Sequence, residues 1–369
     1  MNDNFNGAEL RLARIFNGLT LEELSENVGK TRQYLHRLEV GQSSPTEQLL
    51  EDLARVLQVK KEFLIAKATR RIEDECFHFR KLFSTKAMSK QVAIAHCELT
   101  GRLVSYLDSK LKLPDLRIPD FCNVNSFEAV ENAAELCRKE WGLGLGPVDN
   151  MSRLAENIGV VVTNLSSLSK DIDALSVASS RPIIVRNIYK ESVCRQRFDI
   201  GHELGHLVMH SGLPTGDRVT ESQANHFASA LLIPRSMMFK LFPKPKGSRL
   251  DWVGIREFKM TWKVSLAAIL YRARHLEIIS PDQHKSGVIT LRRTGEAISE
   301  RGDLLIKQEP PELLSTSVNV LATRKQIYAD DIASELGMSV PFLNRVIGFD
   351  MPLGPGRKTS GVRVPLYVV

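Results

Sequence analysis

The segment HELGH, residues 202 to 206, carries the residue types and the spacing of a metal-dependent hydrolase. In an α-helix, His202 and His206 lie one turn and about 40° apart, so both imidazoles point the same way. Two imidazoles placed like this can bind one zinc ion at about 2.0 to 2.1 Å. Glu203, about 100° round from His202, flanks the metal without having to bind it. It is therefore a candidate base for a water whose pKa zinc lowers towards about 7.

A catalytic zinc site needs a third protein ligand and one open coordination position. The segment VTESQANHFASALLIP supplies a candidate, Glu221, at the start of a second expected helix. This helix has an apolar stripe at helical spacing, made of Ala224, Phe227, Ala228 and Leu231. If the loop HSGLPTGDRV makes the reversal, the stripe packs on the HELGH helix and Glu221 faces the metal. The residues predict a zinc site of two histidines and one glutamate.

Four other histidines lie outside this expected ligand set. His210 lies two turns after His202 on roughly the same face, so it either supports the metal ligands or only ends the helix. We expect His226 to be structural. His78 and His96 have no carboxylate or cysteine partner at ligand spacing, so we expect surface or packing histidines.

Composition limits the class of protein. The 369 residues, 43% hydrophobic and 25% charged, predict two or three domains with substantial cores. A net charge of +7 permits a polyanionic partner. The five cysteines, without CxxC spacing, favour reduced, buried thiols. With no signal-like start and no apolar run of about 18 residues, we expect a cytoplasmic protein that does not bind membranes.

Residues 7 to 65 have the pattern of five short helices. The expected boundaries are Thr20 and Gly29 for one helix, Thr31 and Gly41 for the next, and Ser44 with Pro45 at the start of a third. Short helices joined by glycine-containing turns form a helix-turn-helix, whose second helix enters the major groove of DNA. The alternative is a helical dimerisation domain with a solvated basic face.

The second helix of this pair and its flanks carry side chains suited to DNA. Arginine and glutamine reach base edges with two hydrogen bonds, and lysine suits phosphates. The candidate DNA-contacting residues are Lys30, Thr31, Arg32, Gln33, His36, Arg37 and Gln42.

This segment resembles the Xre (Cro/cI-type) repressor family over about 60 residues. The matching positions are Gly29, Leu35, Leu38, Glu39, Gly41 and Pro45. The resemblance implies that Arg32, Gln33 and His36 touch bases of a double-stranded DNA operator, and we expect a homodimer. His36 stands where the family often has a small serine, so the operator sequence does not carry over.

The chain between the two motifs changes character along its length. From 66 to about 110 we expect one or two long connecting helices, which the prolines of KLPDLRIPDF interrupt. Beyond residue 128, two helical patterns lead into Val160, Val161 and Val162, and RPIIVRN (181 to 187) is a second short strand. Strands followed by helices predict an α+β domain.

The segments RQRFDIGHELGHLVMH and ESQANHFASALLIP are similar to the ImmA/IrrE zinc peptidases across about residues 130 to 280. The resemblance implies that His202, His206 and Glu221 bind zinc and that Glu203 is the catalytic base. It also implies a protease that cleaves a repressor, in a family where fusion to an Xre module is familiar. Two departures are visible: Gly201 where alanine is common, and Gln223 where a second glutamate is common.

The segment DDIASELGMSVPFLNRVIG, in the tail from about 285, aligns with the first helix-turn-helix at a constant offset of 308, pairing Ile332 with Leu24 and Gly337 with Gly29. Pro341 falls in the helix that would read DNA, and few basic residues surround it. This pattern favours a helical packing or dimerisation unit over a second DNA reader.

The sequence therefore predicts a multidomain, mostly α protein with an α+β part. The expected domains are an Xre-type helix-turn-helix (1–68), a helical linker (69–125), a zincin-like ImmA/IrrE peptidase domain (126–284) and a C-terminal helix-turn-helix-like helical domain (285–369). Two functions stay open. One is a regulatory zinc endopeptidase that acts on a protein substrate such as a repressor or antitoxin. The other is a non-hydrolytic DNA-binding repressor or antitoxin-like regulator whose zinc domain senses a signal or binds a partner.

Overall fold

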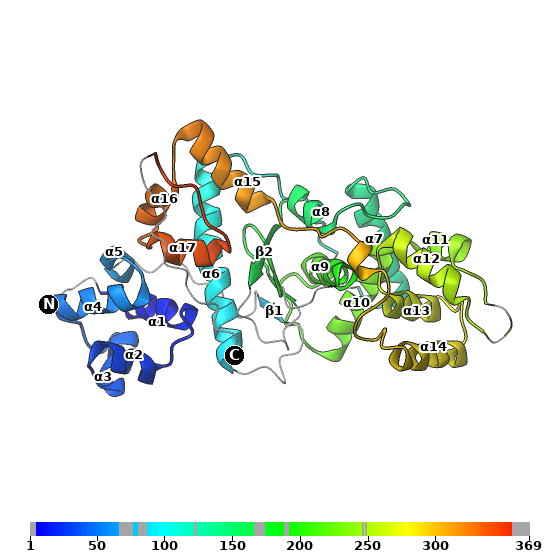
Figure 1. Ribbon diagram of the computed structural model, residues 1–369, viewed down its shortest axis with the longest axis horizontal. Helices are drawn as coiled ribbons and strands as arrows, with labels where there is room; N and C mark the ends of the chain where they lie inside the picture. Colours follow the sequence, from blue (N-terminus) through cyan, green and yellow to red (C-terminus); the bar gives the residue numbers. More distant parts are fainter. Residues whose placement is uncertain are drawn as a thin grey trace. The chain divides into compact units, whose positions relative to one another are not determined.

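The computed structural model describes residues 5–65, 77–79, 87–121, 124–165, 174–187, 192–245, 247 and 249–355 (Figure 1). The chain divides into two compact units. The first consists of Met1–Arg71, Glu98–Lys112 and Leu314–Val369, and the second of Ile72–Cys97 and Leu113–Leu313. The first unit thus combines residues from three of the four expected domains, whose boundaries at 68, 125 and 284 remain proposals.

The first unit begins with the five expected short helices. They are α1 (Gly7–Phe16), α2 (Leu21–Val28), α3 (Arg32–Glu39), α4 (Glu47–Leu57) and α5 (Lys61–Ile65). The capping box of Thr20 and Glu23 is present at the start of α2, and Gly29 ends it in the left-handed conformation. The Thr31 hydroxyl accepts a hydrogen bond from the Tyr34 amide and so caps α3. Short polar caps therefore set the helix-turn-helix boundaries, as the sequence predicts.

One predicted helix start is wrong. The N-cap of α4 is Thr46, whose hydroxyl accepts from the Leu49 amide at 3.3 Å, and Ser44 lies outside the helix. Both residues are good caps, but the Thr46 hydroxyl is the one in reach of a free amide of the first turn. Pro45 is buried ahead of the helix and is not its first residue.

The C-terminal helices pack on the helix-turn-helix within the first unit. They are α15 (Leu313–Val320), a π-helical turn (Leu321–Lys325), α16 (Ala329–Glu335) and α17 (Val340–Ile347). The Phe342 ring on α17 lies 4.7 Å from the Phe16 ring and 6.2 Å from the Phe63 ring, centroid to centroid. Arg345 lies over the Phe16 ring and donates to the Asn17 Oδ1 atom at 2.9 Å. The helix that corresponds to the DNA reader is thus used for packing.

The stretch expected to be helical from 66 to about 110 contains both a strand and a helix. The helix α6 (Ala87–Lys110) confirms a long connecting helix, and Arg102 on it pairs with Glu9 at 2.7 Å. A helix over Phe77–Phe79 is wrong, because this segment forms the strand β1. Its alternating phenylalanines have strand propensity, and the neighbouring strand offers hydrogen-bonding groups along its edge.

The second unit contains a four-stranded sheet of order β1-β3-β4-β2, with β2 (Val161–Leu165), β3 (Ala174–Val177) and β4 (Ile183–Asn187). The strands β2 and β4 are parallel, whereas β3 is antiparallel to both β4 and β1. The expected strands at 160–162 and 181–187 correspond to β2 and β4, and β3 was not anticipated. The helix α9 (Val193–Met209) packs beside β3 and β4 (Figure 1).

The remaining helices of the second unit lie before and after α9 in the chain. They are α7 (Phe127–Glu140), α8 (Met151–Asn157), α10 (Arg218–Leu232), α11 (Arg235–Leu241), α12 (Trp252–Trp262), α13 (Leu266–His275) and α14 (Pro281–Arg293). One apolar core joins residues of most of these helices, including Ile200, Leu204, Phe227 and Trp262. The expected boundary at residue 285 falls inside α14.

Two glycines let α9 and α10 approach closely. A Cβ atom at Gly201 would lie 3.3 Å from the Ala228 Cα atom, and one at Gly205 would lie 3.3 Å from the Ala224 Cα atom. The predicted apolar stripe of α10, which includes Ala224 and Ala228, is fully buried. Small residues on both helices therefore set the distance between them.

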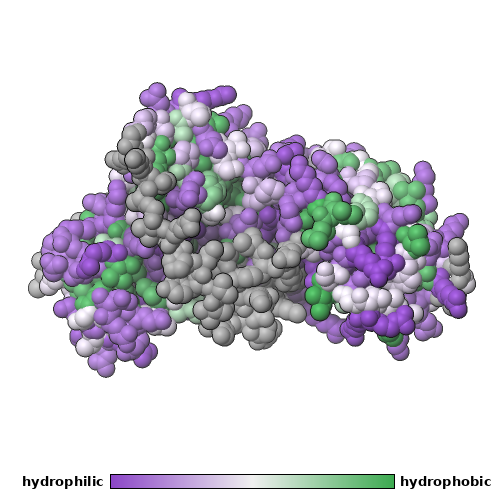
Figure 2. Space-filling view, in the orientation of Figure 1, coloured by the Kyte–Doolittle hydropathy of each residue, from purple (hydrophilic) through white to green (hydrophobic). Residues whose placement is uncertain are grey.

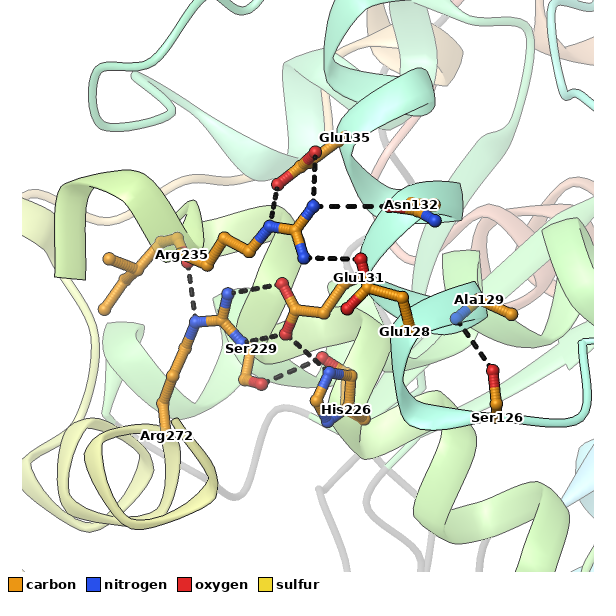
Figure 3. A network of polar contacts seen from close by, with 11 residues as sticks. Ser126, Glu128, Ala129, Glu131, Asn132, Glu135, His226, Ser229, Arg235 and Arg272 are labelled. Carbon is orange, nitrogen blue, oxygen red and sulfur yellow. Dashed lines mark hydrogen bonds and ion pairs between the residues drawn. The ribbon is translucent and has the colours of Figure 1, made fainter. Parts of the chain in front are cut away.

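A buried ion network fixes α10 relative to α7 and α13 (Figure 3). The Arg272 guanidinium donates to both carboxylate oxygens of Glu131, at 2.7 and 3.0 Å, and to the Ile233 carbonyl. His226 Nε2 lies 2.6 Å from the same carboxylate. Burial alone raises the pKa of Glu131, but the hydrogen bonds from His226 and Arg272 outweigh it and bring this pKa to about 2. His226 is thus structural, as the sequence predicts.

Among the described residues, no helix has the length and apolar character that crossing a bilayer requires. Cys97, Cys137 and Cys194 are free and buried, as the expectation of reduced, buried thiols requires. The remaining two, Cys76 and Cys122, lie outside the described residues.

His96 on α6 should make stability depend on pH. It is completely buried, so desolvation lowers its pKa from 6.5 to about 4. As the pH falls, this histidine is protonated in the unfolded chain at a higher pH than in the folded protein. The free energy of unfolding therefore decreases between pH 6.5 and about 4, by about 3 kcal/mol at most. The variant His96→Leu should lose less free energy of unfolding between pH 7 and pH 4 in urea titrations. An unchanged pH dependence in the variant would contradict this prediction.

Gly205→Leu should destabilise the second unit. Its side chain would enter the space of Phe227 and Ala224, where even a Cβ atom is in tight contact. Overpacking of this kind costs about 1 to 3 kcal/mol, which urea titration can measure. Gly146→Leu is the matched control, because a Cβ atom there meets nothing within 4 Å. Equal stability of the two variants would show that the glycine does not set the helix spacing.

Candidate metal centre

The candidate metal ligands come from two helices that pack closely. His202 and His206 lie on α9 and are buried, and Glu221 lies in the first turn of α10. Asp217 caps α10 by accepting from the amides of Val219 and Thr220, which starts the helix just before Glu221. The cap and the close packing of the helices together direct the Glu221 carboxylate towards the histidine pair.

The three side chains form a compact triangle of ligand atoms. The Nε2 atoms of His202 and His206 are 3.0 Å apart, and each lies 3.4 Å from one carboxylate oxygen of Glu221. Ligands at 2.0 to 2.1 Å from a tetrahedral zinc ion lie about 3.3 to 3.4 Å from one another. The triangle is therefore of the size that one zinc ion requires. Among the described residues, these three side chains bring their potential ligand atoms close enough together to hold one metal ion.

The protonation states of these groups also suit a metal. Burial lowers the pKa of His206 to about 4, against the opposing effect of the Glu221 carboxylate. Burial alone raises the pKa of Glu221, but the facing His202 and His206 side chains outweigh it and bring this pKa to about 2. Near pH 7 the site therefore presents a neutral His206 imidazole and an ionised carboxylate, the forms that bind metals.

The other nitrogen of each histidine faces a polar side chain. His202 Nδ1 lies 3.1 Å from the amide oxygen of Asn225 on α10. His206 Nδ1 lies 2.9 Å from His210 Nδ1, and His210 Nε2 lies 2.8 Å from the amide oxygen of Gln223. His210 is buried and ends α9 as its C-cap. Of the two interpretations of His210, contact with a candidate ligand favours the supporting one.

Glu203 is fully buried beside the histidine pair. The hydroxyl of Ser176 on β3 donates to its Oε2 atom at 2.5 Å. A hydrogen bond of this kind limits the orientations of the carboxylate, which as an ionised acceptor can take up a proton. The sheet thus contributes directly to the site through β3.

Arg197, in the RQRF segment before the motif, has a structural part. Its buried guanidinium pairs with Glu309 and donates to the carbonyls of Val148 at 2.6 Å and Lys263 at 3.1 Å. These bonds tie the first turns of α9 to three other segments of the second unit, so Arg197 holds the helix that carries the histidines.

The seven candidate DNA-contacting residues are exposed on and beside α3. Leu35 and Leu38 face the core from the same helix, so the polar face points to solvent. Figure 2 shows a largely hydrophilic surface where Figure 1 places α2 and α3, at the lower left. An exposed helix face of this kind can enter a major groove.

Two contacts around the site escaped the sequence analysis. Ser176 lies on a four-residue strand that has no signal of its own in the sequence. Asn225 did have a signal in the sequence, because it follows Glu221 by four residues and therefore shares its helix face.

The comparisons with known proteins agree with both motifs. Residues 155–274 match a peptidase family model described as an IrrE N-terminal-like domain, and residues 10–64 match a helix-turn-helix family model. No curated protein matches the chain. Among solved structures, the crystal structure of Bacillus thuringiensis PlcR in complex with the peptide PapR7 and DNA is 13% identical. It covers 80% of this chain and 99% of that chain at a TM-score of 0.15, which supports no structural argument.

The two matched ranges contain the motifs from which the fusion was expected. Residues 10–64 include α2 and α3, and residues 155–274 include the HELGH helix and Glu221. A metallopeptidase-like family implies a bound metal, and the ligand triangle fits one. The chain therefore joins an Xre-type helix-turn-helix domain to an ImmA/IrrE-like domain of a metallopeptidase family.

Proposed function

We propose that this protein is a DNA-binding transcriptional regulator with a zinc-dependent endopeptidase domain. Its substrate is a partner protein, such as a repressor or antitoxin, whose cleavage changes gene expression. The observation that carries this proposal is the triangle of His202, His206 and Glu221, with the buried Glu203 next to His202 on the same helix. A metal site that served structure alone would need no such carboxylate and would usually fill its fourth position with a protein ligand.

His202, His206 and Glu221 are the proposed zinc ligands. Two imidazole nitrogens and one carboxylate at tetrahedral spacing match the donors that zinc prefers. Bound there, zinc supplies a Lewis acid that polarises a peptide carbonyl and activates water. The close packing of α9 and α10 holds the three side chains ready, so little ordering is needed on binding.

Glu203 is the proposed general base. Its carboxylate accepts a proton as water attacks the peptide bond and returns it to the leaving amine. The hydrogen bond from Ser176 would hold this carboxylate in a fixed orientation for the reaction. Burial excludes bulk solvent and strengthens the electrostatic effect of the carboxylate on the reacting groups.

The helix-turn-helix domain is the proposed operator-binding part. Arg32, Gln33 and His36 are the proposed base-contacting residues, and Lys30, Thr31, Arg37 and Gln42 are the other proposed DNA contacts. Binding as a homodimer to two half-sites would raise affinity and specificity. DNA binding would then bring the peptidase domain to the genes that it controls, or repress them until a substrate is cleaved.

Glu203→Gln should separate metal binding from hydrolysis. The amide keeps the shape of the side chain and leaves the ligands in place, so we expect zinc content by elemental analysis to match the wild type. Cleavage of a proteome-derived peptide library, read by mass spectrometry, should fall by about 10²- to 10⁴-fold, because an amide cannot accept the proton. Glu257→Gln, at an exposed position of α12, is the matched control and should cleave normally.

Two outcomes would argue against the endopeptidase. One is equal cleavage by the wild type and Glu203→Gln. The other is a zinc-loaded wild type that cleaves nothing in the library, which would favour the non-hydrolytic regulator.

Arg32→Ala and Gln33→Ala should each weaken binding to a sequence selected from random duplex DNA. The loss of one base contact costs about 1 to 3 kcal/mol, measured by fluorescence anisotropy at fixed salt. Arg11→Ala, which removes one positive charge at an exposed position of α1, should change affinity much less. If both α3 variants bind the selected DNA like the wild type, this helix does not read bases.

A further inference from the structure

A chain of hydrogen bonds leads from the backbone of Val124 to the candidate ligand His206. Gln223 Nε2 donates to the Val124 carbonyl at 2.6 Å, and Gln223 Oε1 lies 2.8 Å from His210 Nε2. His210 Nδ1 in turn lies 2.9 Å from His206 Nδ1. His206 Nε2 ends the chain inside the ligand triangle. Four groups from three segments are thus connected in one line.

The chemistry of these groups gives each bond a direction. The Val124 carbonyl can only accept, so the Gln223 amide nitrogen faces it and the amide oxygen faces His210. His210 Nε2 must therefore carry the proton, which leaves Nδ1 of the neutral ring as an acceptor. His206 Nδ1 then donates, and the lone pair of His206 lies on Nε2. That is the nitrogen that faces His202 and Glu221.

We propose that His210 and Gln223 are positioning residues that fix the tautomer and the ring orientation of His206. This inference rests on the proposed function, because the proposed zinc ion is what the fixed lone pair would bind. Neither residue supplies a ligand atom to the triangle. Both act through His206, as hydrogen-bond partners of metal-binding histidines generally do.

The two histidine ligands are held by different means. His202 is oriented in one step by the Asn225 amide oxygen on α10. His206 is oriented through two side chains and a backbone carbonyl, and these hydrogen bonds cross from α9 to α10 and then to Val124 in the segment ahead of α7. Its geometry therefore depends on the packing of all three segments.

Glutamine at position 223 suits this role better than the glutamate common in the resembling family. An amide offers a donor to Val124 and an acceptor to His210 at once. A carboxylate offers acceptors alone, so it can keep the bond to His210 but sets an oxygen against the Val124 carbonyl. Glutamine in place of glutamate at position 223 thus connects the metal site to the backbone ahead of α7.

The first test measures zinc affinity of the full chain by competition with a chromophoric chelator. His210→Phe keeps a ring but removes both nitrogens, and we expect the zinc dissociation constant to rise by about 10- to 100-fold. Gln223→Leu should shift it in the same direction, whereas Gln223→Glu should restore most of the affinity because it still accepts from His210. His284→Phe, the matched control on α14, should leave the constant unchanged. An unchanged constant in His210→Phe overturns the inference.

The second test reads the tautomer directly and needs no metal. In metal-free protein labelled with ¹⁵N-histidine, long-range ¹H–¹⁵N spectra should show His206 protonated at Nδ1 and bare at Nε2. In His210→Phe the proton should move substantially to Nε2, an effect that loss of packing alone would not produce. Protonation of His206 at Nε2 in the wild type overturns the inference. A wild type that binds no zinc refutes the proposed function, and the tautomer then still decides whether the hydrogen-bond chain works as argued.

Discussion

The close approach of α9 and α10 is the constraint on which the rest of the site depends. Without side chains at Gly201 and Gly205, the backbones come near enough for Glu221 to face two histidines on the neighbouring helix. A wider spacing would leave the carboxylate beyond the reach of a shared ion. The histidine spacing within one helix is local, whereas the third ligand depends on tertiary packing.

Buried polar groups then remove the remaining freedom of these two helices. Glu131 connects α10 to α7 and α13, and Arg197 fixes the start of α9. Buried ion pairs add little net stability, since desolvation offsets most of the attraction, but they penalise every arrangement that leaves a charge unpaired. In this protein they specify helix positions. The hydrogen bonds of Ser176 and Asn225 extend the same principle to single side chains at the site.

Sequence patterns anticipated the parts of the structure that follow from local physics. The spacing of His202 and His206 on one helix face, and the cap at Thr20, need nothing beyond the helix itself. The C-terminal pair α16 and α17 was visible as a repeat. Features decided by competition or by long-range contacts were missed: Thr46 rather than Ser44 as a cap, and the strands β1 and β3. Short strands such as β3 form because neighbouring strands are present, which a single sequence does not reveal.

The packing of α17 on the helix-turn-helix also bears on how the protein is made. Phe16 and Phe63 are synthesised early relative to Phe342, which covers them and comes almost 280 residues after Phe63, at position 342 against 63. A ribosome adding about 5 to 20 residues per second needs at least some fourteen seconds for that interval. During this time the aromatic face of the nascent amino-terminal helices has no permanent cover. The helix-turn-helix is therefore synthesised long before the segment that completes its packing.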